Sequence, residues 1–72
     1  MGKKKAGLYA ALIWLANNPD STAYEVAQGI GFEDAWRVFD WLSRAEAQGM
    51  VMRYIRHGEA TPRWQVQGKK VF

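Results

Sequence analysis

The hydrophobic residues of this chain change their spacing at Gly49. Before that glycine they recur at intervals of three and four residues, as in Leu8, Leu12 and Leu15, which predicts amphipathic helices. After it, the stretch from Arg63 to Gln67 alternates strictly, which predicts a β-strand. A chain of 72 residues holds one small domain with a single core. The sequence therefore predicts one α+β domain in which helices precede a β-hairpin.

Local signals place the first two helices. The first is predicted over residues 6–17, where an Asn-Asn-Pro sequence follows its apolar face and stops it. Thr22 and Glu25 have the spacing of a capping box. The second helix therefore starts directly after Thr22, and it ends at the turn between Gly29 and Gly31.

The third helix is predicted to start at Glu33 or Asp34 and to run to about residue 48. Its spacing separates an inward apolar face from an outward polar one. The inward residues are Ala35, Val38, Leu42 and Ala45, and the outward ones are Trp36, Asp40, Ser43 and Ala47. A strand over residues 50–57, a five-residue loop over 58–62 and a strand over 63–67 then complete a two-stranded hairpin.

The composition argues against catalysis, metal binding and membrane insertion. The chain has no Cys, so it lacks disulfides, thiolate metal sites and a cysteine nucleophile. A lone His57 beside Glu59 is too small a ligand set for a metal, which needs three or four. The apolar stretch over residues 8–16 is too short to span a bilayer. We expect a cytoplasmic protein that is not an enzyme and has no cofactor.

Basic residues lie toward the two ends of the chain. Ten Lys and Arg against seven Asp and Glu give a net charge of +3, which is a modest indication of an anionic partner. The acids are concentrated between Asp20 and Glu46. We divide the chain into a basic arm (residues 1–6), a domain (7–67) and a tail (68–72).

Three helices, with a glycine turn between the second and third, followed by a hairpin, resemble the winged helix-turn-helix family of DNA-binding proteins. The most similar segment runs from Leu42 through Gly49 to Val51. The resemblance covers residues 7–67 and implies that the third helix enters the major groove of double-stranded DNA. The predicted hairpin is then the wing of this family, which reaches a neighbouring part of the DNA backbone. We expect a small stand-alone transcriptional regulator of prokaryotic, phage or plasmid type.

Candidate DNA contacts follow from this arrangement. The hydroxyl and free amides at the start of the second helix suit a phosphate, the third helix faces the bases, and cations of the arm and wing suit phosphates. The candidates are Lys3, Lys4, Lys5, Thr22, Trp36, Arg37, Asp40, Ser43, Arg44, Arg56, His57 and Arg63.

Asp40 and Trp36 can each have a role other than DNA contact. Asp40 lies three residues after Arg37 and four before Arg44, so it can simply neutralise them on a solvated face. Trp36 can instead pack against Phe32. A second hypothesis is that an exposed face with Trp36, Trp41 and Asp40 binds a protein partner, because aromatic residues anchor protein interfaces.

A narrower resemblance concerns the Z-alpha winged-helix family, which binds left-handed nucleic acid. Residues 36–40 and 60–64 are similar in layout to that family, and Pro62 and Trp64 match it. The family has Asn and Tyr where this chain has Trp36 and Asp40, and a proline pair at Thr61 and Pro62. These departures disfavour Z-form recognition, and Trp64 can equally pack the hairpin onto the third helix.

The first helix carries more apolar surface than a single small core needs. The candidate surface for a homodimer or another partner consists of Tyr9, Ile13, Trp14, Val71 and Phe72. The alternative is that the tail folds back and covers this face within one monomer.

Overall fold

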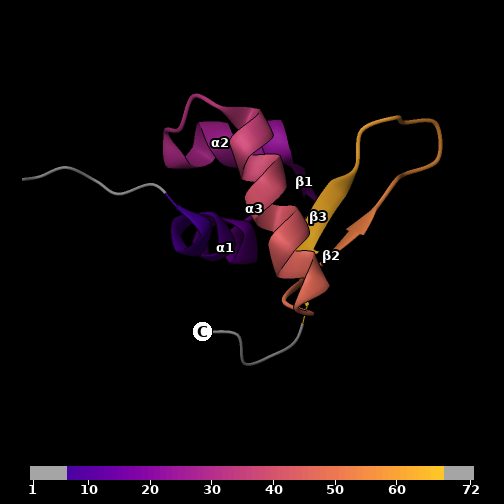
Figure 1. The fold of residues 1–72 in the computed structure, drawn as a ribbon. Helices are drawn as coiled ribbons and strands as arrows, with labels where there is room; N and C mark the ends of the chain where they lie inside the picture. Colours follow the sequence, from indigo (N-terminus) through magenta and orange to yellow (C-terminus); the bar gives the residue numbers. More distant parts are fainter. Residues whose placement is uncertain (1–6, 68–72) are drawn as a thin grey trace, which may run out of the picture.

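The computed structural model describes residues 7–67. Its elements are α1 (Leu8–Asn17), β1 (Ser21–Thr22), α2 (Ala23–Ile30), α3 (Ala35–Ala47), β2 (Val51–Tyr54) and β3 (Arg63–Val66). In Figure 1, α3 lies in front of α1 and α2, and the loop between β2 and β3 extends away from the helices. The predicted α+β order of three helices followed by a hairpin is confirmed. The arm (1–6) and tail (68–72) lie outside the described residues.

Side-chain amides end α1. The Asn17 amide donates to the Ile13 carbonyl oxygen at 3.1 Å, and the Asn18 amide donates to the Trp14 carbonyl oxygen at 2.9 Å. The Asn18 side chain thereby satisfies the Trp14 carbonyl, whose usual donor, the Asn18 backbone amide, donates to the Leu15 carbonyl instead. The predicted stop at the Asn-Asn-Pro sequence is therefore confirmed, with Asn17 as the last helical residue.

Both ends of α2 have the predicted chemistry. The Thr22 hydroxyl accepts from the Glu25 amide at 3.1 Å, and the Glu25 carboxylate accepts from the Thr22 amide at 2.9 Å, which completes the capping box. At the other end Gly31 has a φ of 75°, a left-handed conformation that glycine adopts without strain. The turn from α2 to α3 is therefore fixed by local sequence.

The core lies between the three helices and the sheet. It consists of Ala11, Leu12, Leu15, Ala23, Val26, Ala27, Val38, Leu42, Ala45, Val51 and Trp64. Trp64 is completely buried and meets the ring of Phe39 edge-on, with centroids 5.5 Å apart. Trp64 therefore packs the hairpin onto α3, which is the structural role predicted for it.

The sheet differs from the predicted two-stranded hairpin. It has three antiparallel strands in the order β1-β3-β2, with Ser21 opposite Trp64 and Val51 opposite Val66. The two residues of β1 are too few to show an alternating pattern. The first hairpin strand ends at Tyr54 rather than at residue 57, so the loop covers 55–62. A turn in which the Glu59 amide donates to the carbonyl of residue 56 ends the ladder early.

Candidate nucleic-acid interface

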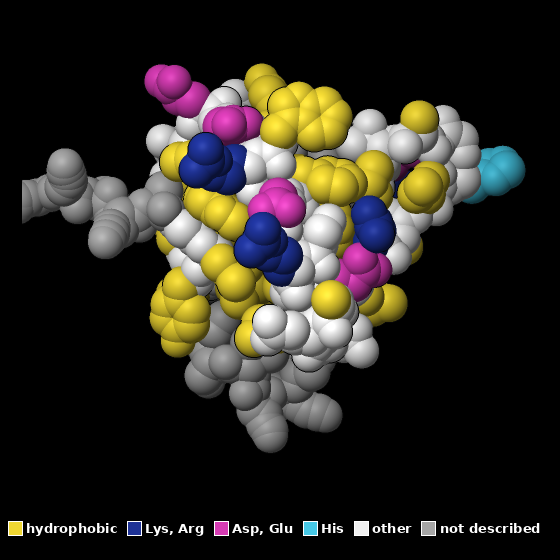
Figure 2. Space-filling model, in the orientation of Figure 1, with side chains coloured by type: hydrophobic (Ala, Val, Ile, Leu, Met, Phe, Trp, Pro, Cys, Tyr) yellow, Lys and Arg dark blue, Asp and Glu magenta, His cyan; other side chains and the backbone are white. Residues whose placement is uncertain are grey.

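The outward face of α3 is open to solvent. Asp34 caps the helix by accepting from the amides of Trp36 and Arg37 at 3.1 and 3.2 Å. Trp36 is 81% exposed. A shallow hollow of about 510 Å³ on this face is lined by Asp34, Trp36, Arg37, Asp40, Trp41 and Arg44. Figure 2 looks onto it, and basic and acidic side chains alternate there along α3.

Burial along α3 follows the predicted faces except at Ala35, predicted inward but only partly buried, and at Ser43. Val38, Leu42 and Ala45 are buried, whereas Ser43 is partly buried rather than outward. The alternative in which Trp36 is partly buried against Phe32 is wrong, because Trp36 is 81% exposed. The ring near Phe32 is that of Trp41, with centroids 5.0 Å apart. The Trp36 ring lies 6.3 Å from that of Phe39. Trp36 therefore borders Phe39 and is largely open to solvent.

Both exposed arginines of α3 lie beside carboxylates of the same helix or its cap. Arg44 Nε lies 3.1 Å from Asp40 Oδ2, and Arg37 Nε lies 4.0 Å from Asp34 Oδ2. The side chains of Arg37 and Arg44 are 62% and 74% exposed. Exposed ion pairs of this kind contribute about 0–1 kcal/mol. Phosphates can therefore displace these carboxylates at little cost.

The wing arginines are tied to the body of the domain. Arg63 donates to the Glu59 carboxylate at 2.9 and 3.2 Å and to the Asp20 carbonyl at 2.8 Å, and Glu25 Oε1 lies 3.6 Å away. Only 18% of the Arg63 side chain is exposed. The hydrogen bond to Glu59 raises the pKa of Arg63 above its usual value. Arg56 pairs with the Asp20 carboxylate. Of the candidate contacts, Arg63 is therefore the least able to turn toward a phosphate.

The structure gives less support to the remaining candidate DNA contacts. The Thr22 hydroxyl already accepts a hydrogen bond within the capping box, and the Glu25 carboxylate occupies the same helix end. A phosphate at this end of α2 would meet a negative charge. His57 is exposed in the hairpin loop. Lys3, Lys4 and Lys5 lie outside the described residues.

The charge of the described domain is opposite in sign to that of the whole chain. Residues 7–67 hold five arginines and seven carboxylates, a formal net charge of −2, whereas all five lysines of the chain lie outside them. Each of the five arginines has a carboxylate within 4.0 Å. The excess positive charge of the sequence therefore comes from the lysines of the arm and the tail.

Sequence reasoning missed two residues of this region. Arg53 pairs with Glu46 at 3.0 Å, and its guanidinium lies 5.8 Å from the Phe39 ring and 5.2 Å from the Trp64 ring. Asp20 has a φ of 71° and holds Arg56, as described above. Neither ion pair has the three- or four-residue spacing of a helix face, so no local pattern marks them.

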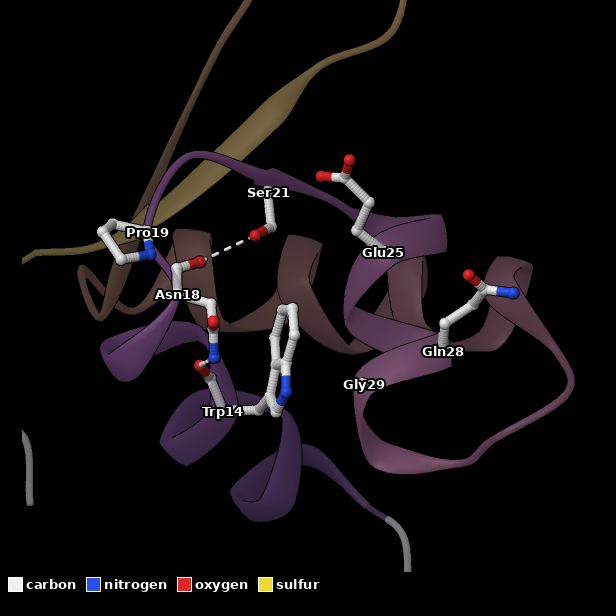
Figure 3. A pocket seen from close by; sticks show the side chains of 7 residues that line it. All are labelled: Trp14, Asn18, Pro19, Ser21, Glu25, Gln28 and Gly29. Carbon is white, nitrogen blue, oxygen red and sulfur yellow. Dashed lines mark hydrogen bonds between the residues drawn. The ribbon is translucent and has the colours of Figure 1, made fainter.

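The apolar side chains of α1 are arranged in two ways. Tyr9 is 64% exposed and Ile13 is 46% exposed. Trp14 instead lines a groove of about 540 Å³ between α1 and α2, where its ring lies against Gly29 (Figure 3). Val71 and Phe72 lie outside the described residues.

Within residues 7–67 no group of three or more His, Cys, Asp or Glu side chains is placed to hold a metal ion. No helix in that range is long and apolar enough to cross a membrane.

Fold and topology together define a winged helix-turn-helix domain. No protein-family model matches the chain, and no curated protein does. Among solved structures, a mutant of ZitR from Lactococcus lactis has this fold, with a TM-score of 0.71 and 17% sequence identity. The match covers 99% of this chain and 52% of the ZitR chain, so the chain spans about half the length of that protein. At this identity the likeness concerns the fold alone.

Proposed function

We propose that the protein binds double-stranded DNA, with α3 in the major groove. The observation that carries the proposal is the open outward face of α3, which displays Trp36, Arg37, Asp40 and Arg44 beside the wing. A helix of 13 residues is about 20 Å long. The major groove, about 12 Å wide, admits such a helix with its side chains.

Cations of α3 and of the two chain ends contribute to DNA binding in different ways. Arg37 can exchange its exposed carboxylate partner for a phosphate, while the lysines of the arm and tail supply the positive charge that residues 7–67 lack. Arg63 fixes the wing instead of contacting DNA. If about five cations reach phosphates, log affinity falls with log salt at a slope of about −4.5.

The test is a salt titration of binding to a mixed-sequence duplex, with paired variants. Arg37→Gln and Ala16→Glu each lower the net charge by one at an exposed site, on α3 and α1 respectively. We expect Arg37→Gln to reduce both the affinity and the salt slope, by about 0.9 in the slope. Ala16→Glu is expected to leave the slope unchanged.

Replacing Lys3, Lys4 and Lys5 together by alanine tests the contribution of the arm. We expect a lower slope, by up to about three times 0.9. Absence of binding at low salt, or equal effects of Arg37→Gln and Ala16→Glu, would refute the proposal.

The finer assignment is a small regulator of transcription of prokaryotic, phage or plasmid type, acting in the cytoplasm. Its support is the compact single module and the exposed recognition face. A chromatin-capture experiment in the source cell tests it, because a regulator is enriched at promoters and a non-specific binder is not.

A protein partner is the second candidate, favoured by the 81% exposure of Trp36 and by the net negative charge of residues 7–67. Trp is enriched among the residues that anchor protein interfaces, and a negative surface does not attract DNA. Trp36→Ala separates the candidates, because it would abolish capture of a protein partner while changing the salt slope on DNA little.

We also propose a homodimer through α1, where Ile13 and Tyr9 extend the apolar surface beyond the core. Two copies would contact two half-sites and raise the affinity for one DNA molecule. Sedimentation over a range of concentrations tests this, and a strict monomer at high micromolar concentration would exclude it.

A further inference from the structure

We propose that Asp40 is a positioning residue that holds Arg44 for recognition of a guanine in the major groove. The inference rests on the proposed DNA binding and adds the base that one side chain recognises. Asp40 and Arg44 are one helical turn apart on the outward face of α3, and Asp40 Oδ2 lies 3.1 Å from Arg44 Nε.

The contact leaves the recognising end of Arg44 available. A guanidinium carries five N–H donors in a rigid fork. The shortest approach of Asp40 to the guanidinium is at Nε, and neither terminal nitrogen of Arg44 donates a hydrogen bond within residues 7–67. Those two nitrogens match the O6 and N7 acceptors of guanine, which is the commonest specific contact in the major groove. The attraction of Asp40 for Nε favours rotamers of Arg44 that keep this ion pair, so Arg44 loses less rotamer freedom on binding.

Arg37 provides the contrast. Its Nε lies 4.0 Å from Asp34, and the other oxygen of Asp34 is occupied by the amides that cap α3. Arg37 is therefore not held in one direction, which suits a phosphate contact better than a base contact. Arg44 is the exposed arginine of α3 with a close carboxylate.

A carboxylate on this face has a second effect, which makes the inference testable. Asp40 is 56% exposed and repels phosphates whatever the base sequence. It therefore lowers affinity for all DNA while orienting the side chain that discriminates. A residue with a purely structural role would not move these two properties in opposite directions.

The experiment selects binders from a library of duplexes with a randomised central segment, using the full chain and three variants. Asp40→Asn removes the charge and weakens the contact with Arg44. Glu33→Gln is the matched control, because it removes the same charge at an exposed site that has no ion pair within residues 7–67. Arg44→Lys keeps the positive charge but lacks the fork.

We expect the unmodified chain to prefer guanine at one position by about tenfold. Arg44→Lys and Asp40→Asn should lose most of that preference. Asp40→Asn and Glu33→Gln should both bind unselected DNA more tightly, by a similar factor, and Glu33→Gln should keep the guanine preference.

The possible outcomes distinguish failure of the proposed role of Asp40 from failure of the proposed DNA binding. If the chain binds DNA but shows no guanine preference, or if Asp40→Asn keeps it, the role of Asp40 is refuted and DNA binding stands. If no duplex is retained at low salt, the proposed function itself fails.

Discussion

An alanine side chain at Gly29 in α2 would collide with Trp14. A Cβ at this position would lie 2.1 Å from Trp14 Cε2 and 2.4 Å from Cζ2 and Nε1. Non-bonded carbons favour separations of about 3.5–4.0 Å, so the indole of Trp14, which lies against Gly29 in Figure 3, would have to move out of its groove.

Two opposing contributions set the change in the free energy of unfolding on Gly29→Ala. Alanine in place of glycine in a helix stabilises by up to about 1 kcal/mol. A tryptophan ring that gives up about 100 Å² of buried apolar surface costs about 2.5 kcal/mol. We therefore expect Gly29→Ala to lower the free energy of unfolding by about 1.5 kcal/mol, against the direction of helix propensity.

Urea denaturation of four proteins measures this directly: the unmodified chain, Gly29→Ala, Trp14→Ala and the double variant. With Trp14 removed, the clash disappears, and Gly29→Ala should stabilise by up to about 1 kcal/mol. The coupling between the two sites is then about 2.5 kcal/mol. Stabilisation by Gly29→Ala in the unmodified background, or a coupling near zero, would refute the packing argument.

Three further predictions concern stability. Trp64→Ala should cost about 3–5 kcal/mol, and Trp64→Phe clearly less, because the buried Nε1 has no partner among the described residues; equal losses on denaturation would contradict this. The hydrogen bond from Arg63 holds the pKa of Glu59 below its usual value, so its stabilising effect is present above the ordinary Glu pKa and is lost as the pH falls through the lowered one. Melting temperatures of Glu59→Gln and the unmodified chain should therefore converge in acid, and a gap independent of pH would argue against the pairing. Thr22→Ala should cost about 1 kcal/mol through loss of the cap, whereas Thr61→Ala in the exposed loop should cost less than about 0.5 kcal/mol.

The helices were predictable because their signals act within a few residues. The stop of α1 at Asn17, the capping box at Thr22 and the left-handed Gly31 are all interactions between neighbours within about four positions. The strand lengths were not predictable from such signals. A hairpin ladder ends where a turn, such as the one in which the Glu59 amide donates within the loop, uses the backbone hydrogen bonds instead.

The candidate interface was predictable in part. The outward placement of Trp36 and Asp40 follows from helical periodicity, and the structure agrees. The wing was different, since Arg63 was a candidate DNA contact and instead donates to the Asp20 carbonyl and the Glu59 carboxylate. Composition gave the net charge of the chain but not how its charges pair.

The sequence alone determined three helices, their order and the face that α3 turns outward, because capping and periodicity are properties of adjacent residues. Only the tertiary structure decided that β1 joins the sheet opposite Trp64, that Trp14 packs on Gly29 and that Arg63 is held by Asp20. Those contacts join residues far apart in the chain, and they exist only once the packed core fixes which backbone segments lie side by side.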